Sequence, residues 1–194
     1  MDNEEFLRVH KSFDELEKRG SFYDMALNLI SKDFEIEAYL LILATWNFAS
    51  FRYVVNSFDL NGFKKLVAEC KKEIKDLKGL EIRNADLDSV SETIKKAYTE
   101  LSLSPGVKFT GAAKLLHLMN KDLFVMWDGH IRKHYNLGTS PEDYLNFLKK
   151  MQEEFKEINW EGERTFAKVI DEYNYVKFTL PSLKEQKEKR KRKN

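Results

Sequence analysis

Apolar residues recur every three or four positions along almost the whole chain, and this periodicity limits its fold more than any other feature. Between residues 3 and 18, for example, Phe6, Val9 and Phe13 follow that spacing with charged residues between them, as on an amphipathic helix. Only residues 122–127 (DLFVMW) resemble a strand, and one short strand cannot build a sheet. The spacing predicts helices over residues 3–18, 21–30, 35–46, 63–78, 86–101, 108–119, 128–135, 141–158 and 163–177.

This pattern predicts a single compact all-α domain of about eight to ten helices. The chain has 194 residues, enough for a sizeable core, and no Gly/Ser-rich linker or repeat divides residues 1–183. The segment from Glu35 to Trp46 is apolar on nearly every face after Glu37, so we expect it to be the most buried helix. Asp86 or Asp88 is expected to cap the helix that ends at residue 101.

Other features of the sequence restrict the class of protein. Cys70 is the only cysteine, which excludes a disulfide framework and a cysteine-rich zinc site and fits a reducing compartment. The N-terminus is acidic and lacks the apolar core of a secretion signal, and the longest apolar stretch, AYLLILATW, is too short to span a bilayer. We therefore expect a cytoplasmic monomer that does not enter a membrane.

The last eleven residues, 184–194, form a basic tail. They hold seven basic and two acidic residues, a net charge of +5, so residues 1–183 carry −4 of the overall +1. Such a cluster can be a solvated extension of a helix. It can also be an arm that binds polyanions, because basic clusters release counterions from nucleic acid.

The segment from Ser104 to Gly138 contains two unusual charged residues. Lys114 lies among apolar residues of the helix predicted over 108–119, at the margin of its apolar side. Desolvation there would lower the pKa of the amine and make it a better nucleophile. Asp128 precedes the next helix and could supply a counter-charge. Alternatively, Asp128 only caps that helix, and Lys114 only lays its stem on apolar neighbours with its amine in water.

The same segment resembles the active-site region of the helix-hairpin-helix DNA glycosylases, a superfamily that includes endonuclease III and 8-oxoguanine DNA glycosylase. Lys108 stands where these proteins have a second glycine, so the hairpin is degenerate. About 35 residues carry the resemblance directly. The matching residues are Pro105, Gly106 and Val107 of the hairpin, Lys114 after Gly111, and Asp128, His130, Ile131, Asn136, Leu137 and Gly138 of the segment WDGHIRKHYNLG. Arg132 lies one position away from the arginine of these proteins.

The resemblance implies an all-helical DNA-repair enzyme without a metal or cofactor. In such an enzyme Lys114 would attack the sugar C1′ of a damaged nucleotide and form a Schiff base, and Asp128 would stabilise the positive charge that develops on the sugar. A damaged base must be flipped out of the duplex first. Trp127 could stack near it, but a core tryptophan that closes the helix junction is the interpretation that its size favours. The residues expected to contact DNA are Gly106, Val107, Lys108, Gly111, His130 and Arg132.

Other functions are compatible with the sequence. The same scaffold could be a non-catalytic module that binds nucleic acid or a protein partner. His130 and His134 are four residues apart, which is metal-ligand spacing, but no glutamate completes a zinc-protease motif. No nucleophile-elbow motif and no Gly-rich phosphate loop occur. The position of Lys114 distinguishes the two main hypotheses, because only catalysis requires its amine in a pocket with Asp128.

Overall fold

The computed structural model describes residues 2–18 and 20–191, and its helices confirm the all-α class, since none of the described residues lies in a strand. Three short turns, η1 (Val55–Ser57), η2 (Ile74–Leu77) and the π-helical η3 (Tyr175–Thr179), join some of the helices. The α-helices are α1 (Asn3–Leu16), α2 (Gly20–Ser31), α3 (Glu35–Trp46), α4 (Phe48–Phe51), α5 (Leu60–Glu73), α6 (Ser91–Leu103), α7 (Lys108–Met119), α8 (Gly129–His134), α9 (Pro141–Glu154), α10 (Phe166–Asn174) and α11 (Leu180–Lys191).

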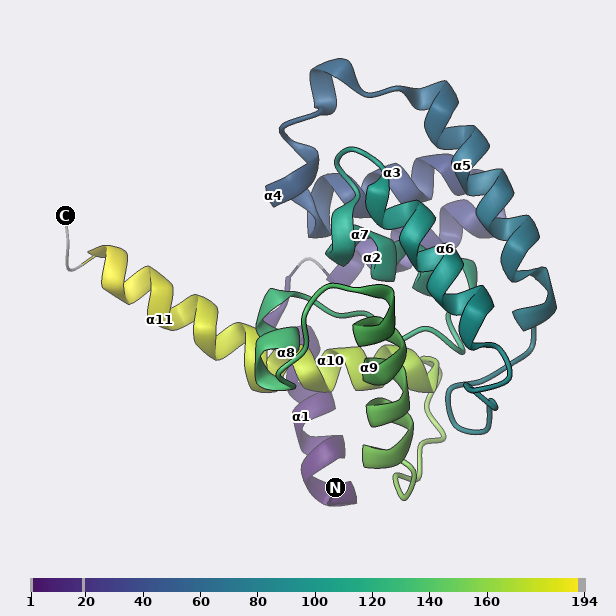
Figure 1. Ribbon diagram of the computed structural model, residues 1–194. Coiled ribbons are helices and arrows are strands. Elements are labelled where there is room, and N and C mark those ends of the chain that lie inside the picture. Colours follow the sequence, from purple (N-terminus) through teal and green to yellow (C-terminus); the bar gives the residue numbers. More distant parts are fainter. Residues whose placement is uncertain (1, 19, 192–194) are drawn as a thin grey trace.

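The helices form two groups that lie one above the other in Figure 1. Helices α2 to α7 make up the upper group, in which α2 packs against α3 and α6 packs against α7. The lower group contains α8, α9 and α10, and also the N-terminal helix α1, which packs against α10. Contacts between α6 and α9 hold the two groups together. Sequence-distant helices thus meet at the boundary between the groups.

Capping residues near the first turn determine where the predicted helices begin. Ser140 and Asp143 form a reciprocal capping box, with 3.1 Å from the Asp143 N–H to Ser140 Oγ and 3.0 Å from the Ser140 N–H to Asp143 Oδ2. Pro141 follows at the first helical position, as its fixed φ favours. The helix predicted from Pro141 is therefore confirmed, and so is the one predicted over residues 108–119.

The apolar run at residues 122–127 is a buried connection between α7 and α8, without strand structure. Residues 123–127 are all buried, and the Tyr144 hydroxyl donates a hydrogen bond to the Val125 carbonyl at 3.0 Å. The run is apolar because it crosses the core. It carries the chain directly to Asp128 and so positions that residue from the inside of the molecule.

The prediction that α3 is the most buried helix is wrong. Only Ala38, Tyr39, Ile42 and Leu43 of its twelve residues are buried, and Ala44 is exposed. The most buried helix is α10, in which all residues but the first of nine are buried, charged ones included. An all-round apolar surface does not require all-round burial. Helix α10 buries its charged residues because Lys168 pairs with Asp171 and Glu172 of the same helix, and partners outside the helix also pair with Glu172.

The expected cap at Asp86 or Asp88 is also wrong. Helix α6 begins at Ser91, and Asp86 Oδ1 instead accepts the N–H groups of Asp88 and Ser89, both at 3.2 Å, in the turn before it. An aspartate that satisfies its own turn in this way is not free to cap the helix that follows.

Helix α11 projects from the body of the protein and contains no buried residue (Figure 1). It begins at Leu180 and continues through most of the basic tail, so the tail is a helical arm as far as Lys191. Residues 192–194, the end of the predicted tail, lie outside the described residues.

Candidate functional site

A cavity of about 370 Å³ lies between the two helix groups and brings Lys114 and Asp128 together. Lys114 enters it from α7 and Asp128 from the start of α8. Elements α1, α3, α4, α10, η3 and α11 complete the walls. The lining includes Phe13, Trp46, Asn47, Thr110, Lys114, Trp127, Asp128, Asp171, Tyr175 and Thr179.

Lys114 is partly buried, and its amine is held at the end of α3. Its Nζ donates a hydrogen bond to the carbonyl of Trp46, the last residue of that helix, and lies 6.0 Å from the centre of the Trp46 ring. Carbonyl groups at a helix C-terminus attract cations, so this contact favours the protonated amine. To act as a nucleophile, Lys114 must leave the carbonyl and lose a proton.

Gly111 lets α7 approach α3 closely enough for this contact. A Cβ at Gly111 would lie 2.8 Å from Asn47 Nδ2 and 3.1 Å from Leu43 Cδ2. Gly111 therefore packs inside the protein, one helical turn before Lys114. Its predicted contact with DNA stays a prediction, while its packing role is visible in the structure.

Asp128 is the N-cap of α8 and is fixed by three hydrogen bonds. Its Oδ1 accepts the N–H groups of His130 at 2.7 Å and Ile131 at 3.0 Å, which confirms the capping role. Its Oδ2 accepts the hydroxyl of Thr179, from η3, at 2.7 Å. One oxygen thus serves the helix, and the other joins α8 to the segment that follows α10.

A third charged residue lines the cavity, Asp171 of α10. Its Oδ2 lies 2.9 Å from Lys168 Nζ, and Lys168, which is 1% exposed, also lies 3.2 Å from Glu172 Oε1. Burial raises the pKa of Asp171 above its usual value, although Lys168 lowers it and the charge of Lys114 acts in the same direction as Lys168. Sequence reasoning missed Asp171, since α10 reads as an ordinary amphipathic helix.

The carboxylate of Glu172 is neutralised from three directions. Arg164 Nη1 lies 2.8 Å from Glu172 Oε1, and His10 Nδ1 of α1 lies 2.7 Å from Oε2. Burial alone would raise the pKa of Glu172, but Lys168, His10 and Arg164 outweigh it and lower the pKa to about 2. Glu172 is therefore ionised inside the protein, and its carboxylate is a second anionic partner of Lys168 beside Asp171.

Aromatic rings enclose the amine of Lys168. Its Nζ lies 4.8 Å from the centre of the Phe13 ring, 5.0 Å from that of Tyr23 and 5.1 Å from that of Trp46. The Trp46 ring thus contacts both this buried lysine and Lys114. Because Lys168 already has two carboxylate partners, its role in the described structure is to support the wall of the cavity.

Behind this wall lies a buried histidine of α7. The His117 ring nitrogens are 2.8 Å from the Tyr23 hydroxyl and 2.6 Å from the Phe124 carbonyl. Burial lowers the pKa of His117 to about 3, so the ring is neutral at physiological pH. It connects α2, α7 and the buried connection to α8.

The predicted hairpin residues Gly106 and Val107 are buried, and Lys108 is exposed. Asn47 Nδ2 donates to the carbonyls of both buried residues, at 2.9 Å and 2.8 Å, and the Val107 N–H donates to the Ser104 carbonyl at 3.1 Å. Gly106 has a φ of +80°, and a Cβ there would lie 2.3 Å from Val54 Cγ2. The turn is therefore closed against α4, and the Val107 N–H is already satisfied.

The two remaining predicted DNA contacts differ in position. His130 lines the cavity and is partly buried. The guanidinium of Arg132 lies 5.3 Å from the centre of the Trp127 ring, and its buried Nη1 has no hydrogen-bond partner among the described residues. Arg132 packs behind the cavity, so the structure brings His130, but not Arg132, to its lining. Contact of either residue with DNA stays a prediction.

Comparisons of the chain with protein-family models, with curated proteins and with solved structures return no match. Over the described ranges, no helix combines the length and the apolar character that crossing a membrane requires. Within the same ranges, no three His, Cys, Asp or Glu side chains gather as metal ligands would.

Proposed function

We propose that the chain is a DNA base-excision glycosylase with lyase activity, in which Lys114 and Asp128 form the active centre. The observation that carries the proposal is that both residues line one cavity of about 370 Å³. Pockets of this size and mixed polarity are typical of small-ligand sites. Trp46 and Tyr175, which are partly buried, add aromatic surface on which a flipped-out base could stack, whereas Trp127 packs in the core.

The proposed reaction starts with transfer of a proton from Lys114. Asp171 lines the same cavity, and its raised pKa suits it to receive this proton. The neutral amine attacks the sugar C1′, and the C1′–N bond breaks with its electron pair leaving on the base, which takes up the proton that Asp171 received. The C1′–O4′ bond then breaks as a second amine proton passes to O4′. The carboxylate of Asp128 stabilises the positive charge that develops on the sugar.

The product is a Schiff base between Lys114 and the opened sugar. Loss of the C2′ proton and departure of the 3′-phosphate then break the strand by β-elimination. Borohydride reduces the Schiff base to a stable amine, which makes the intermediate measurable.

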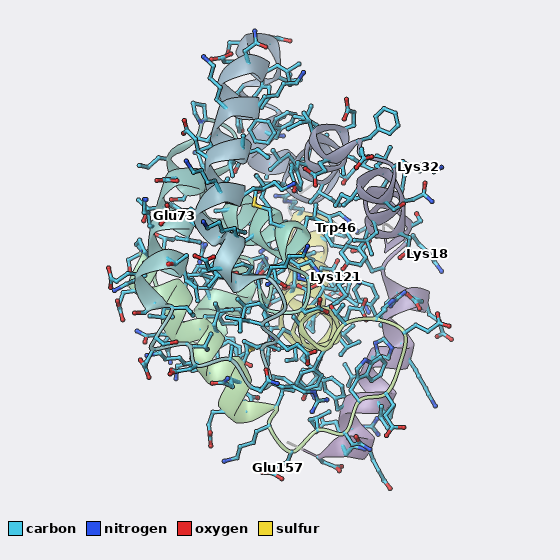
Figure 2. The ribbon with its side chains drawn as sticks, turned by 90° about the vertical axis from the view of Figure 1, so that its right-hand side faces the viewer. Lys18, Lys32, Trp46, Glu73, Lys121 and Glu157 are labelled. Carbon is cyan, nitrogen blue, oxygen red and sulfur yellow. The ribbon has the colours of Figure 1, made fainter. Side chains whose placement is uncertain are left out.

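The experiment is borohydride trapping on duplex DNA with an abasic site, since this substrate does not require the lesion to be known. Wild type should form a covalent complex, and Lys114→Gln should lose it while remaining folded. Lys121→Gln is the matched control, because Lys121 is an exposed lysine just after α7 and outside the cavity lining (Figure 2). Undiminished trapping by Lys114→Gln would refute the lyase assignment.

The second candidate is a non-catalytic nucleic-acid-binding module on the same scaffold. The observation in its favour is that both proposed catalytic groups already have structural partners, the Trp46 carbonyl for Lys114 and the α8 N–H groups for Asp128. Base release from a panel of damaged duplexes decides between the candidates. A wild-type protein that binds DNA but neither traps nor releases any base supports this second function.

A further inference from the structure

A second hollow, of about 760 Å³, adjoins the cavity and lies between α8, η3 and α11. Gly129 and His130 line both spaces, so the two spaces adjoin at the start of α8. Figure 1 shows α11 leaving the body beside α8. We call this hollow the α8–α11 groove. Its walls include Lys133 and His134 of α8, Lys177 and Phe178 of η3, and Glu185 and Lys189 of α11.

The groove is basic and has ordered walls. The His134 ring stacks on the Phe178 ring with centres 3.6 Å apart, which joins α8 to η3. Lys177 pairs with Glu5 and Lys189 pairs with Glu185, each at 2.5 Å. Among the described residues that line the groove, Glu185 is the one carboxylate, against three lysines, two of which are paired with a carboxylate.

Helix α11 extends this positive charge away from the body. It has no buried residue, so its conformation does not depend on covering the core. Beyond the groove it also carries Lys184, Lys187, Arg190 and Lys191, against Glu188 alone. A helix that projects into solvent with this composition presents a row of cations to an extended polyanion.

We infer that the α8–α11 groove binds the phosphodiester backbone of the DNA strand next to the nucleotide held in the cavity. This inference rests on the proposed function, because that function is what places a nucleotide in the cavity. Because the two spaces adjoin at Gly129 and His130, one strand that places a nucleotide in the cavity would carry its neighbouring phosphates to the groove. At about 1.5 Å per residue, the twelve residues of α11 span about 18 Å, the rise of about five nucleotides of one strand.

The experiment measures the affinity of the full chain for a fluorescent duplex with a central abasic-site analogue, over a range of salt concentrations. The variant K133Q/K189Q removes one cation from each of two walls. If each lysine neutralises one phosphate, the slope of log K against log salt falls by about two, and affinity at 0.1 M salt falls at least about tenfold. The control K64Q/K65Q removes two exposed lysines of α5, on the opposite side of Figure 1, and should bind like wild type.

Substrate length supplies an independent criterion. Shortening the duplex to fewer than about five base pairs on one side of the analogue should remove most of the difference between wild type and K133Q/K189Q. An unchanged salt slope, or a loss that does not depend on flank length, would overturn the inference. Competition by polyglutamate as strong as by DNA of equal charge would also overturn it, in favour of an acidic protein partner.

This test and the trapping experiment can fail separately. K121Q should retain both the wild-type salt slope and wild-type trapping, since Lys121 lines neither the cavity nor the groove. If wild type traps no abasic DNA but K133Q/K189Q still lowers the salt slope, the protein binds DNA in the groove without being a lyase. Trapping by K133Q/K189Q as strong as by wild type on long DNA at 0.1 M salt and limiting protein would show that the groove does not hold the substrate.

Discussion

The α7–α8 segment and helix α10 both contribute charged groups to the same cavity, yet only the first is conspicuous in the sequence. Lys114 stands out because its neighbours are apolar, and Asp128 because a helix follows it. In α10, Lys168 and Asp171 are spaced like the solvent side of an amphipathic helix, but both are buried. A charged residue therefore predicts exposure only where no other residue neutralises it. Here Lys168 and Asp171 neutralise each other within the helix. Glu172 also pairs with Arg164 and His10, which lie outside the helix.

The helices that the sequence predicted well are those with local signals at their ends. Asp128 and Ser140 cap α8 and α9 through N–H groups two or three residues away, so a short window of sequence contains the whole interaction. The π-helical turn η3 has no such signal. It places Thr179 against Asp128, 51 residues earlier in the chain, and only the packed structure brings the two together.

The same distinction applies to the candidate site. The prediction that Lys114 and Asp128 face a common cavity required only α7, the connection after it and α8, and the structure confirms that both line it. Asp171 and Trp46 come from helices far away in the sequence, and one sequence contains no information on which distant helices meet. The roles of the predicted DNA contacts stay predictions.

The largest expected difference between the two regions is in the stability cost of losing a lysine, Lys168 in α10 or Lys114 in α7. Lys168→Met should lower the free energy of unfolding by about 3–5 kcal/mol, because it leaves the buried carboxylate of Asp171 without its cation while keeping the side-chain volume. Lys114→Met should lower it by about 1 kcal/mol or less, since Lys114 is only partly buried. Urea unfolding followed by circular dichroism measures both.

A second variant separates charge from packing at Lys168. K168M/D171N removes both members of the pair, while Glu172 keeps Arg164 and His10. It should recover most of the stability that Lys168→Met loses. If the single and double variants are equally unstable, the loss comes from packing against the aromatic rings, and the claimed difference between the two regions would disappear.

Acid pH sharpens the comparison, because the two regions lose stability in different ranges. The pKa of His117 in α7 falls from 6.5 to about 3 on folding, so the unfolded chain binds a proton more readily and stability declines as the pH falls below about 6.5. The pKa of Glu172 in α10 falls from 4.5 to about 2, so its contribution, on the order of 3 kcal/mol, is lost between these values. Asp171, with a raised pKa, acts in the opposite direction.

Two substitutions test which residue causes the loss of stability in each pH range. His117→Gln should flatten the unfolding free energy between about pH 6.5 and pH 4.5, and Glu172→Gln should flatten its decline below about pH 4.5. Both variants are compared with wild type by urea unfolding at half-unit intervals of pH. A decline above pH 4.5 that persists in His117→Gln would show that another group is responsible.

The smallest expected change in stability, at Asp128, separates the structural role of a residue from its proposed chemical role. Asn can accept the N–H groups of His130 and Ile131 through Oδ1, and its amide can donate to the Thr179 hydroxyl, which reverses that hydrogen bond. Asp128→Asn should therefore lower the free energy of unfolding by about 1 kcal/mol or less, because Asn caps helices nearly as well as Asp.

The negative charge is lost, however, and base release should slow by about a hundredfold or more if that charge stabilises the transition state. Urea unfolding and single-turnover base release, measured on the same preparation, provide the two quantities. Base release that slows only in proportion to a loss of folded protein would restrict Asp128 to its cap, and would leave the cavity without the carboxylate that the proposed chemistry requires.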